Sequence, residues 1–314
     1  MSKQPAPRYM GGQAVMEGVM MRGASSWAVA VRTPDGSIEV DVNDAPNWAE
    51  RYSHIPFVRG ITTLGESLSL GFKALAWSAN LQVPEEERLS SRAMGWTVAT
   101  ALTIFSAIFL VLPALAVRGI GGWIGATGIW SHVAEGALRL TLFIGYILAI
   151  GQLKDIKRVF QYHGAEHKAI AAYENEVELS PESAQQFSTE HVRCGTNFLL
   201  TVMLVAIVVY SAFGRPALPL LILSRVVLIP VIAGVSYEII RFAAGHMQWG
   251  WVRACMKPGL MLQRLTTRPP SLDQLEVAIA SLRAVMTPEQ LAAVESRVGL
   301  RRSMPVPKTA LGIA

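Results

Sequence analysis

Four long apolar stretches divide the chain, and their length predicts helices that cross a membrane. The first carries no charge and is about as long as the ~20 residues that span hydrocarbon. The second is shorter and has Arg139 near one end, where its charged head can reach the interface by snorkelling. The fourth contains Pro230, which predicts a kink. The four stretches are residues 98–117, 138–153, 198–213 and 217–240.

The N-terminal part shows a strand pattern instead. Residues 27–31 and 37–42 alternate apolar and polar side chains, and the turn sequence 33–36 between them predicts a β-hairpin. Residues 61–81 are apolar but include Glu66 and Lys73, which favours an amphipathic helix lying on the bilayer. The fold class that follows is an α-helical polytopic membrane protein of about four transmembrane helices, with a small N-terminal unit containing a β-hairpin and with cytoplasmic helices.

Residues 11–23 combine four glycines with methionines around one acid. Glycine lets the backbone approach another group closely, so Gln13, Glu17 and Arg22 could face a polar centre. The alternative is a strand and turn in which Glu17 and Arg22 pair with each other. The pattern alone leaves both interpretations open.

The remaining segments are mostly helical. Residues 154–173 are expected to continue the second span as a helix with Gly164 as its weak point, followed by a loop over 174–190 that holds at most one helical turn. A turn and short helix are expected in 258–267. Ser271 is a predicted cap for a helix to residue 284, and Pro288 begins another.

These elements suggest four parts. The first, 1–96, is an N-terminal cytoplasmic and interfacial unit, and 97–255 is the membrane domain with a His-rich loop at 154–197. The third, 256–300, is a C-terminal helical unit, and 301–314 is a disordered tail.

Composition supports the membrane assignment. The chain is 51% hydrophobic, has a mean hydropathy of +0.34 and is only 16% charged, which is unusual for a soluble domain. The net charge of +5 is scattered beside apolar segments, so it favours a lipid bilayer and not nucleic acid as the partner. The basic residues place both termini and the loop 154–197 in the cytoplasm, at the plasma (inner) membrane. The oligomeric state is left open.

The chemistry is concentrated at His163, Glu166 and His167. This H-x-x-E-H spacing puts two imidazoles and a carboxylate on one helix face, as in sites where two histidines bind a metal and the acid prepares a water. His191 and Cys194 follow one loop later and offer two further ligands of the kind that zinc prefers. The alternative is a structural cluster in which histidine and glutamate satisfy each other.

The leading functional hypothesis is a metal-dependent hydrolase at the cytoplasmic face, with zinc favoured and Glu166 as general base. Glu174 or Glu178 could add an acidic ligand, and a peptide or a lipid headgroup is the expected substrate. A second hypothesis is a non-enzymatic scaffold or assembly factor for other membrane proteins, with a closed structural zinc site. A third, a transporter, would depend on Arg225 within the fourth stretch.

Four separated motifs in order give the chain a resemblance to the bacterial YqhQ-like family. They are residues 11–23, 163–168, 191–196 and 258–267, the last followed by Glu276-Val277-Ala278-Ile279. The resemblance extends from Gly11 to about Leu282 and implies a multi-pass membrane protein, described for that family as a predicted metal-dependent enzyme of undetermined function. This chain has Arg268-Pro269-Pro270 where the family pattern has an acid before a single proline, so that acid has no counterpart here.

Overall fold

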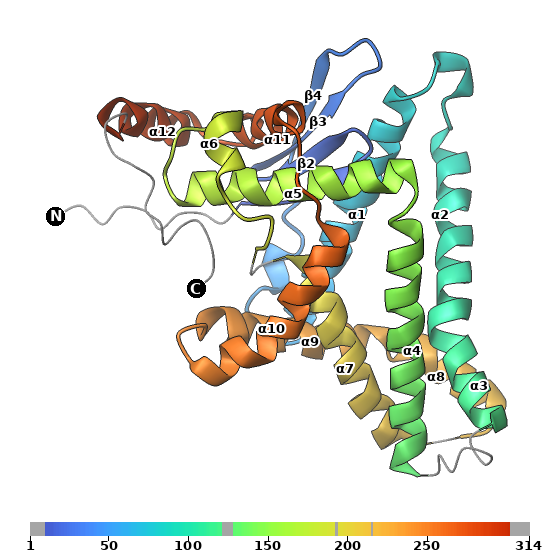
Figure 1. Cartoon of the computed structure of the whole chain (residues 1–314). Coiled ribbons are helices and arrows are strands. Elements are labelled where there is room, and N and C mark those ends of the chain that lie inside the picture. The colour runs from blue at the N-terminus through green and yellow to red at the C-terminus, as the bar shows by residue number, and fades with distance from the viewer. Residues whose placement is uncertain (1–9, 121–127, 192–193, 215, 302–314) are drawn as a thin grey trace.

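The computed structural model describes residues 10–120, 128–191, 194–214 and 216–301. A mixed unit of strands and helices forms one end of the molecule, and long apolar helices extend away from it (Figure 1). The tail expected after Arg301 lies outside the described residues.

The mixed unit is built on a four-stranded antiparallel sheet in the order β1-β2-β3-β4. β3 and β4 form the predicted hairpin, which is confirmed, with Ala30 paired to Val40. Gly36 takes a φ of 90° in its turn, a conformation that favours glycine. Residues 11–23 are a second hairpin, β1 and β2, so the strand-and-turn interpretation of this segment holds. The strands are β1 (Gly11–Val15), β2 (Gly18–Arg22), β3 (Ser26–Arg32) and β4 (Ile38–Asp44).

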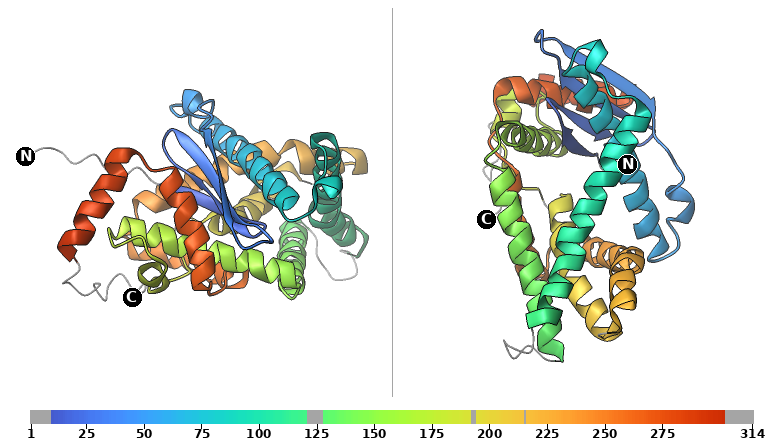
Figure 2. Two further views of the ribbon diagram at one scale, coloured as in Figure 1. Left: turned by 90° about the horizontal axis from the view of Figure 1, so that it is seen from above. Right: turned by 90° about the vertical axis from the view of Figure 1, so that its right-hand side faces the viewer.

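Both faces of the sheet are covered by helices that come from distant parts of the chain. The helix α1 (Val58–Leu81) packs on one face, while α5 (Lys154–Glu174) and α11 (Leu272–Ala284) pack on the other (Figure 2, left). Strand alternation sends successive side chains to opposite faces, so each strand contributes to two apolar layers. The α5 and α11 side buries Met10, Val19, Met21, Ala28 and Ala30, and the α1 side buries Val15, Met20, Trp27, Val29 and Val31.

The long apolar helices correspond to the four predicted stretches. The first is α2 (Ser91–Ser106) continued through a π-helical turn, Ala107–Val111, into α3 (Leu112–Ile120). The next two are α4 (Ile129–Ile150) and α7 (Gly195–Phe213). Among the described residues, these three helices are long and apolar enough to cross a membrane. The pair α8 (Leu218–Val227) and α9 (Ile229–Gly245) bends by 42° next to Pro230 and raises the count to four if it is one span.

Three local predictions need correction. Arg139 does not snorkel, because it is buried and donates from Nη2 to Glu135 at 2.8 Å and from Nε to the Phe109 carbonyl. The helix α5 does not continue α4, since the chain turns at residues 151–153 and α5 runs across the ends of the long helices (Figure 1). Pro258 lies inside the single helix α10 (Gly250–Thr266) and does not mark a turn.

Gly164 is likewise a contact point and not a weak point. It lies in mid-helix, and a Cβ there would meet the carbonyl oxygen of Arg268, so only glycine allows this close approach. The predicted cap at Ser271 is confirmed, with a full capping box to Gln274. Four shorter or terminal elements complete the described chain: the 3₁₀ turns Glu50–Tyr52 and Glu85–Glu87, α6 (Pro181–Gln185) and α12 (Pro288–Arg301).

Candidate metal centre

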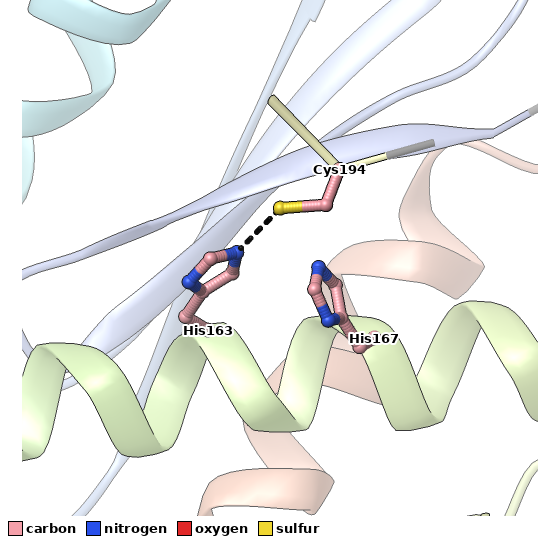
Figure 3. Close-up of side chains that lie close together, drawn as sticks. All are labelled: His163, His167 and Cys194. Atoms are coloured by element: carbon pink, nitrogen blue, oxygen red, sulfur yellow. Dashed lines mark hydrogen bonds between the residues drawn. The ribbon is translucent and has the colours of Figure 1, made fainter. Parts of the chain in front are cut away.

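Three of the predicted ligands lie together. His163 and His167 are one turn apart on α5, and Cys194 is the residue that caps the N-terminus of α7 (Figure 3). One ligand atom from each residue lies within 4.8 Å of the other two, and the two imidazole rings are 4.5 Å apart. Nε2 of His163 is 3.3 Å from Sγ of Cys194. Two imidazoles and one thiol are a donor set that zinc prefers.

Backbone carbonyls determine which ring nitrogen carries the proton in His163 and His167. Nδ1 of His163 is 2.9 Å from the carbonyl oxygen of Thr266, and Nδ1 of His167 is bonded to that of Thr189. A carbonyl oxygen only accepts, so each Nδ1 must carry the proton and donate it. Each Nε2 is then left with its lone pair. Histidine ligands of metals are typically oriented in this way by a carbonyl behind the ring.

Burial keeps two of the three donors, His167 and Cys194, uncharged. Burial lowers the pKa of His167 to about 3, so this ring is neutral. Burial raises the pKa of the Cys194 thiol to about 11, while hydrogen bonds from the hydroxyl and amide of Thr196 oppose that rise. A bound divalent ion would displace the thiol proton and leave a thiolate at the start of a helix, where the helix dipole favours negative charge.

Glu166 lies between the two histidines on α5 and is 5% exposed. Burial raises the pKa of its carboxyl group, and the nearby His163 and His191 and a hydrogen bond from the backbone N–H of Gly12 act against that rise. A Cβ on Gly12 would lie 3.2 Å from Cγ of Glu166, so the glycine in β1 lets the strand pass directly over this side chain.

A cavity of about 480 Å³ connects these groups. Its walls come from β1, α1, α5 and the start of α7, and they include the three donors together with Glu166 and His191. This volume lies in the range of small-molecule sites, ~300–1,000 Å³. The site therefore brings three side chains that could bind a metal, a buried carboxyl group and space for a reactant together in one place.

His191 stands beside the three donors. Its ring centre is 5.6 Å from that of His167, and its Nε2 lies 3.3 Å from the carboxylate of Glu174. The amide of the fully buried Gln263 both accepts from and donates to the backbone of His191 and so holds it in place. The structure thus assigns Glu174 to His191, and Glu178 does not line the cavity among the described residues.

The expected pair between Glu17 and Arg22 is wrong. Glu17, at the tip of the first hairpin, forms a bidentate ion pair with Arg158 of α5. Arg22 pairs with the buried Glu66 of α1 and lines a neighbouring cavity of about 500 Å³. Both pairs fasten the sheet to its covering helices, and neither carboxylate belongs to the three-donor group.

Sequence reasoning missed the groups that support the donors. The carbonyls of Thr189 and Thr266 and the amide of Gly12 are backbone atoms, which every residue carries and no side-chain pattern marks. Thr266 and Gly12 do fall within two of the noted motifs. Their place within these motifs was therefore the signal that the sequence offered for these two residues.

The fold and site together define a protein of long apolar helices that carries a His₂Cys cluster in a mixed α/β unit at one end. The chain belongs to the DUF1385 family, whose model matches residues 55–288 and is described as "Protein of unknown function". It is 34% identical over 310 residues to the "Uncharacterized protein YqhQ" of Bacillus subtilis (strain 168), covering 93% of this chain and 96% of that protein. The resemblance to the YqhQ-like family is thereby confirmed. No solved structure matches the chain.

Proposed function

We propose that this protein is a membrane-embedded, zinc-dependent hydrolase that acts at the cytoplasmic face. The observation that carries the proposal is the joint geometry of the cavity. Two histidines with their Nδ1 atoms held by carbonyls, one cysteine and one buried carboxyl group line the same space. Three protein donors leave a fourth position of a tetrahedral ion for a reactant, which is typical of catalytic zinc sites and not of closed structural ones.

Each residue then has a role. His163, His167 and Cys194 would hold the ion, which when bound supplies a Lewis acid for a carbonyl or phosphoryl group. Glu166 acts as general base toward a water in the cavity, and its raised pKa brings it closer to the operating pH. The N–H of Gly12 holds the carboxylate in one orientation.

The assignment to the cytoplasmic face rests on the proposed orientation of the chain in a membrane. The long apolar helices would span the plasma (inner) membrane, and Lys154, Lys157 and Arg158 lie where α5 begins, just after α4. The positive-inside rule then places this end, with both chain termini, in the cytoplasm. Reporter fusions at Glu178 and at the C-terminus should both report a cytoplasmic position. A periplasmic signal at Glu178 would contradict the proposed orientation.

The test of the chemistry is Glu166→Gln, which keeps the shape of the side chain and removes the base. The hydrolytic activity of this variant should fall by roughly 10²–10⁴-fold, the usual contribution of a positioned acid–base group, while its zinc content stays unchanged. The variant should therefore fail to complement a deletion strain. His163→Ala should lose the zinc. Glu178→Gln is the matched control, because this carboxylate lies outside the cavity, and it should complement fully.

The same experiment separates the enzyme from a scaffold with a structural metal site. A scaffold needs the ligands but not the base. Full complementation by Glu166→Gln at normal zinc content would therefore overturn the hydrolase and leave a structural zinc site as the function of the cluster.

A further inference from the structure

The strand β1 is an edge of the sheet, and its outer side faces the cavity. The backbone N–H of Gly12 donates a hydrogen bond to Glu166. The backbone N–H of Met16 donates one to Oγ of Ser78, at 3.3 Å. Neither amide therefore points toward β2. In an antiparallel strand the outward groups belong to every second residue. Ala14 lies between these two residues and lines the cavity, so its N–H and C=O also point outward.

The space along this edge is a groove and not an isolated pocket. The cavity of about 480 Å³ that holds the histidines shares residues 10–13 and Ser67 with the second cavity of about 500 Å³. The two cavities therefore follow β1 on both of its faces. A Cβ on Gly11 would meet no atom within 4 Å, so the backbone at the start of the strand is open to a close approach.

We infer, resting on the proposed function, that the groove binds an extended peptide chain, which adds to β1 as a further strand and is cleaved at the metal centre. The amides of Gly12 and Met16 already donate to side chains of the protein, so an added strand does not use them. The outward C=O of Gly12 and the outward N–H and C=O of Ala14 are complementary to the backbone of another peptide. In the reaction, water adds across the peptide C–N bond. The hydroxyl joins the carbonyl carbon, and Glu166 passes the proton to the leaving nitrogen.

Two serines of α1 give a matched pair for testing the groove. Ser67 and Ser69 are both exposed, but Ser67 lines both cavities and Ser69 lines neither. Ser67→Trp should obstruct the groove, and Ser69→Trp should not. The probes are a pool of acetylated, amidated hexapeptides, the same pool with alternate amides N-methylated, and dihexanoyl phosphatidylglycerol. The protein is the full chain in detergent, loaded with zinc and carrying Glu166→Gln to prevent cleavage. Binding of each probe is measured by co-elution and mass spectrometry.

The unmethylated pool should bind, and its retention should fall roughly tenfold on N-methylation, as expected for the loss of about two backbone hydrogen bonds. Ser67→Trp should reduce retention similarly and Ser69→Trp should leave it unchanged. Equal retention of the methylated pool would overturn strand addition even if a tryptophan variant failed to fold. Retention of the phospholipid without the peptides would also overturn it, while leaving a hydrolase in place.

The proposed hydrolase activity is tested separately, by measuring peptide cleavage by the zinc-loaded native chain. Peptides that bind in the groove and are recovered uncleaved would end the hydrolase proposal and preserve the peptide site. Peptides cleaved with new N-termini, together with the two binding differences, support both.

Discussion

Gly12 offers the sharpest test of how β1 and α5 fit together, because its neighbour Gly11 provides a control with the same chemistry. A methyl group at Gly12 would lie 2.9 Å from Sδ of Met21 and 3.2 Å from Cγ of Glu166, and closer still to the carbonyl oxygen of Met20. A methyl group at Gly11 meets nothing within 4 Å. Gly12→Ala therefore forces the strand to shift, and Gly11→Ala does not.

These contacts determine how much stability Gly12→Ala should lose. Overpacking of this kind costs about 1–3 kcal/mol. Both substitutions also restrict the unfolded chain, which stabilises by about 0.4–1 kcal/mol and cancels between the two variants. Since a domain of this size loses about 2–4 °C per kcal/mol, Gly12→Ala should melt roughly 2–12 °C below Gly11→Ala. Intrinsic tryptophan fluorescence during heating in detergent measures the difference.

Gly12→Ala should also reduce activity more than zinc content, because it displaces the carboxyl group of Glu166 and touches none of the three donors. Equal melting temperatures for Gly11→Ala and Gly12→Ala would refute the close passage of β1 over α5, and with it the role of the Gly12 amide.

Two further results are expected. Burial raises the pKa of the Cys194 thiol to about 11, whereas His167 is already neutral above a pH of about 3. Zinc binding should therefore release about one proton, from the thiol. The affinity for zinc should then rise about tenfold per pH unit between roughly pH 8 and 10. In competition with a chelator, Cys194→Ser should flatten this slope, and an unchanged slope would argue against the thiol as a ligand. Glu135→Gln should destabilise the protein by about 3–5 kcal/mol, since it leaves the buried Arg139 and Arg225 without their shared carboxylate, and a native-like melting temperature would contradict the network.

Local patterns predicted most of the elements, because their causes lie within a few residues. Hydropathy marked the long helices, and the second of them begins at Ile129, earlier than expected, since the residues before Leu138 have polar side chains that are buried inside the protein. The cap at Ser271 and the bend at Pro230 follow from the chemistry of single residues. These features need no knowledge of the tertiary fold.

Other features depend on contacts between distant segments, and the sequence indicated only some of them. Arg139 was expected at an interface, but it is buried because the carbonyl of Phe109 accepts from it and because its partner Glu135 is shared with Arg225. Arg22 and Glu17 were close in sequence and oppositely charged, yet each found a partner on a different helix. The histidine spacing predicted a shared face, and Cys194 was expected to join it from the segment ahead of the third apolar stretch, as it does at the start of α7.

We propose that His163, His167 and Cys194 bind one zinc ion with a fourth position open to a reactant. Zinc K-edge X-ray absorption on the purified, zinc-loaded full chain tests it directly. We expect one ion per chain, with one sulfur at about 2.3 Å and three nitrogen or oxygen atoms at about 2.0–2.1 Å, and loss of the sulfur signal in Cys194→Ser. A chain that retains no zinc, or zinc surrounded only by oxygen and nitrogen in the native protein, would contradict this three-donor site.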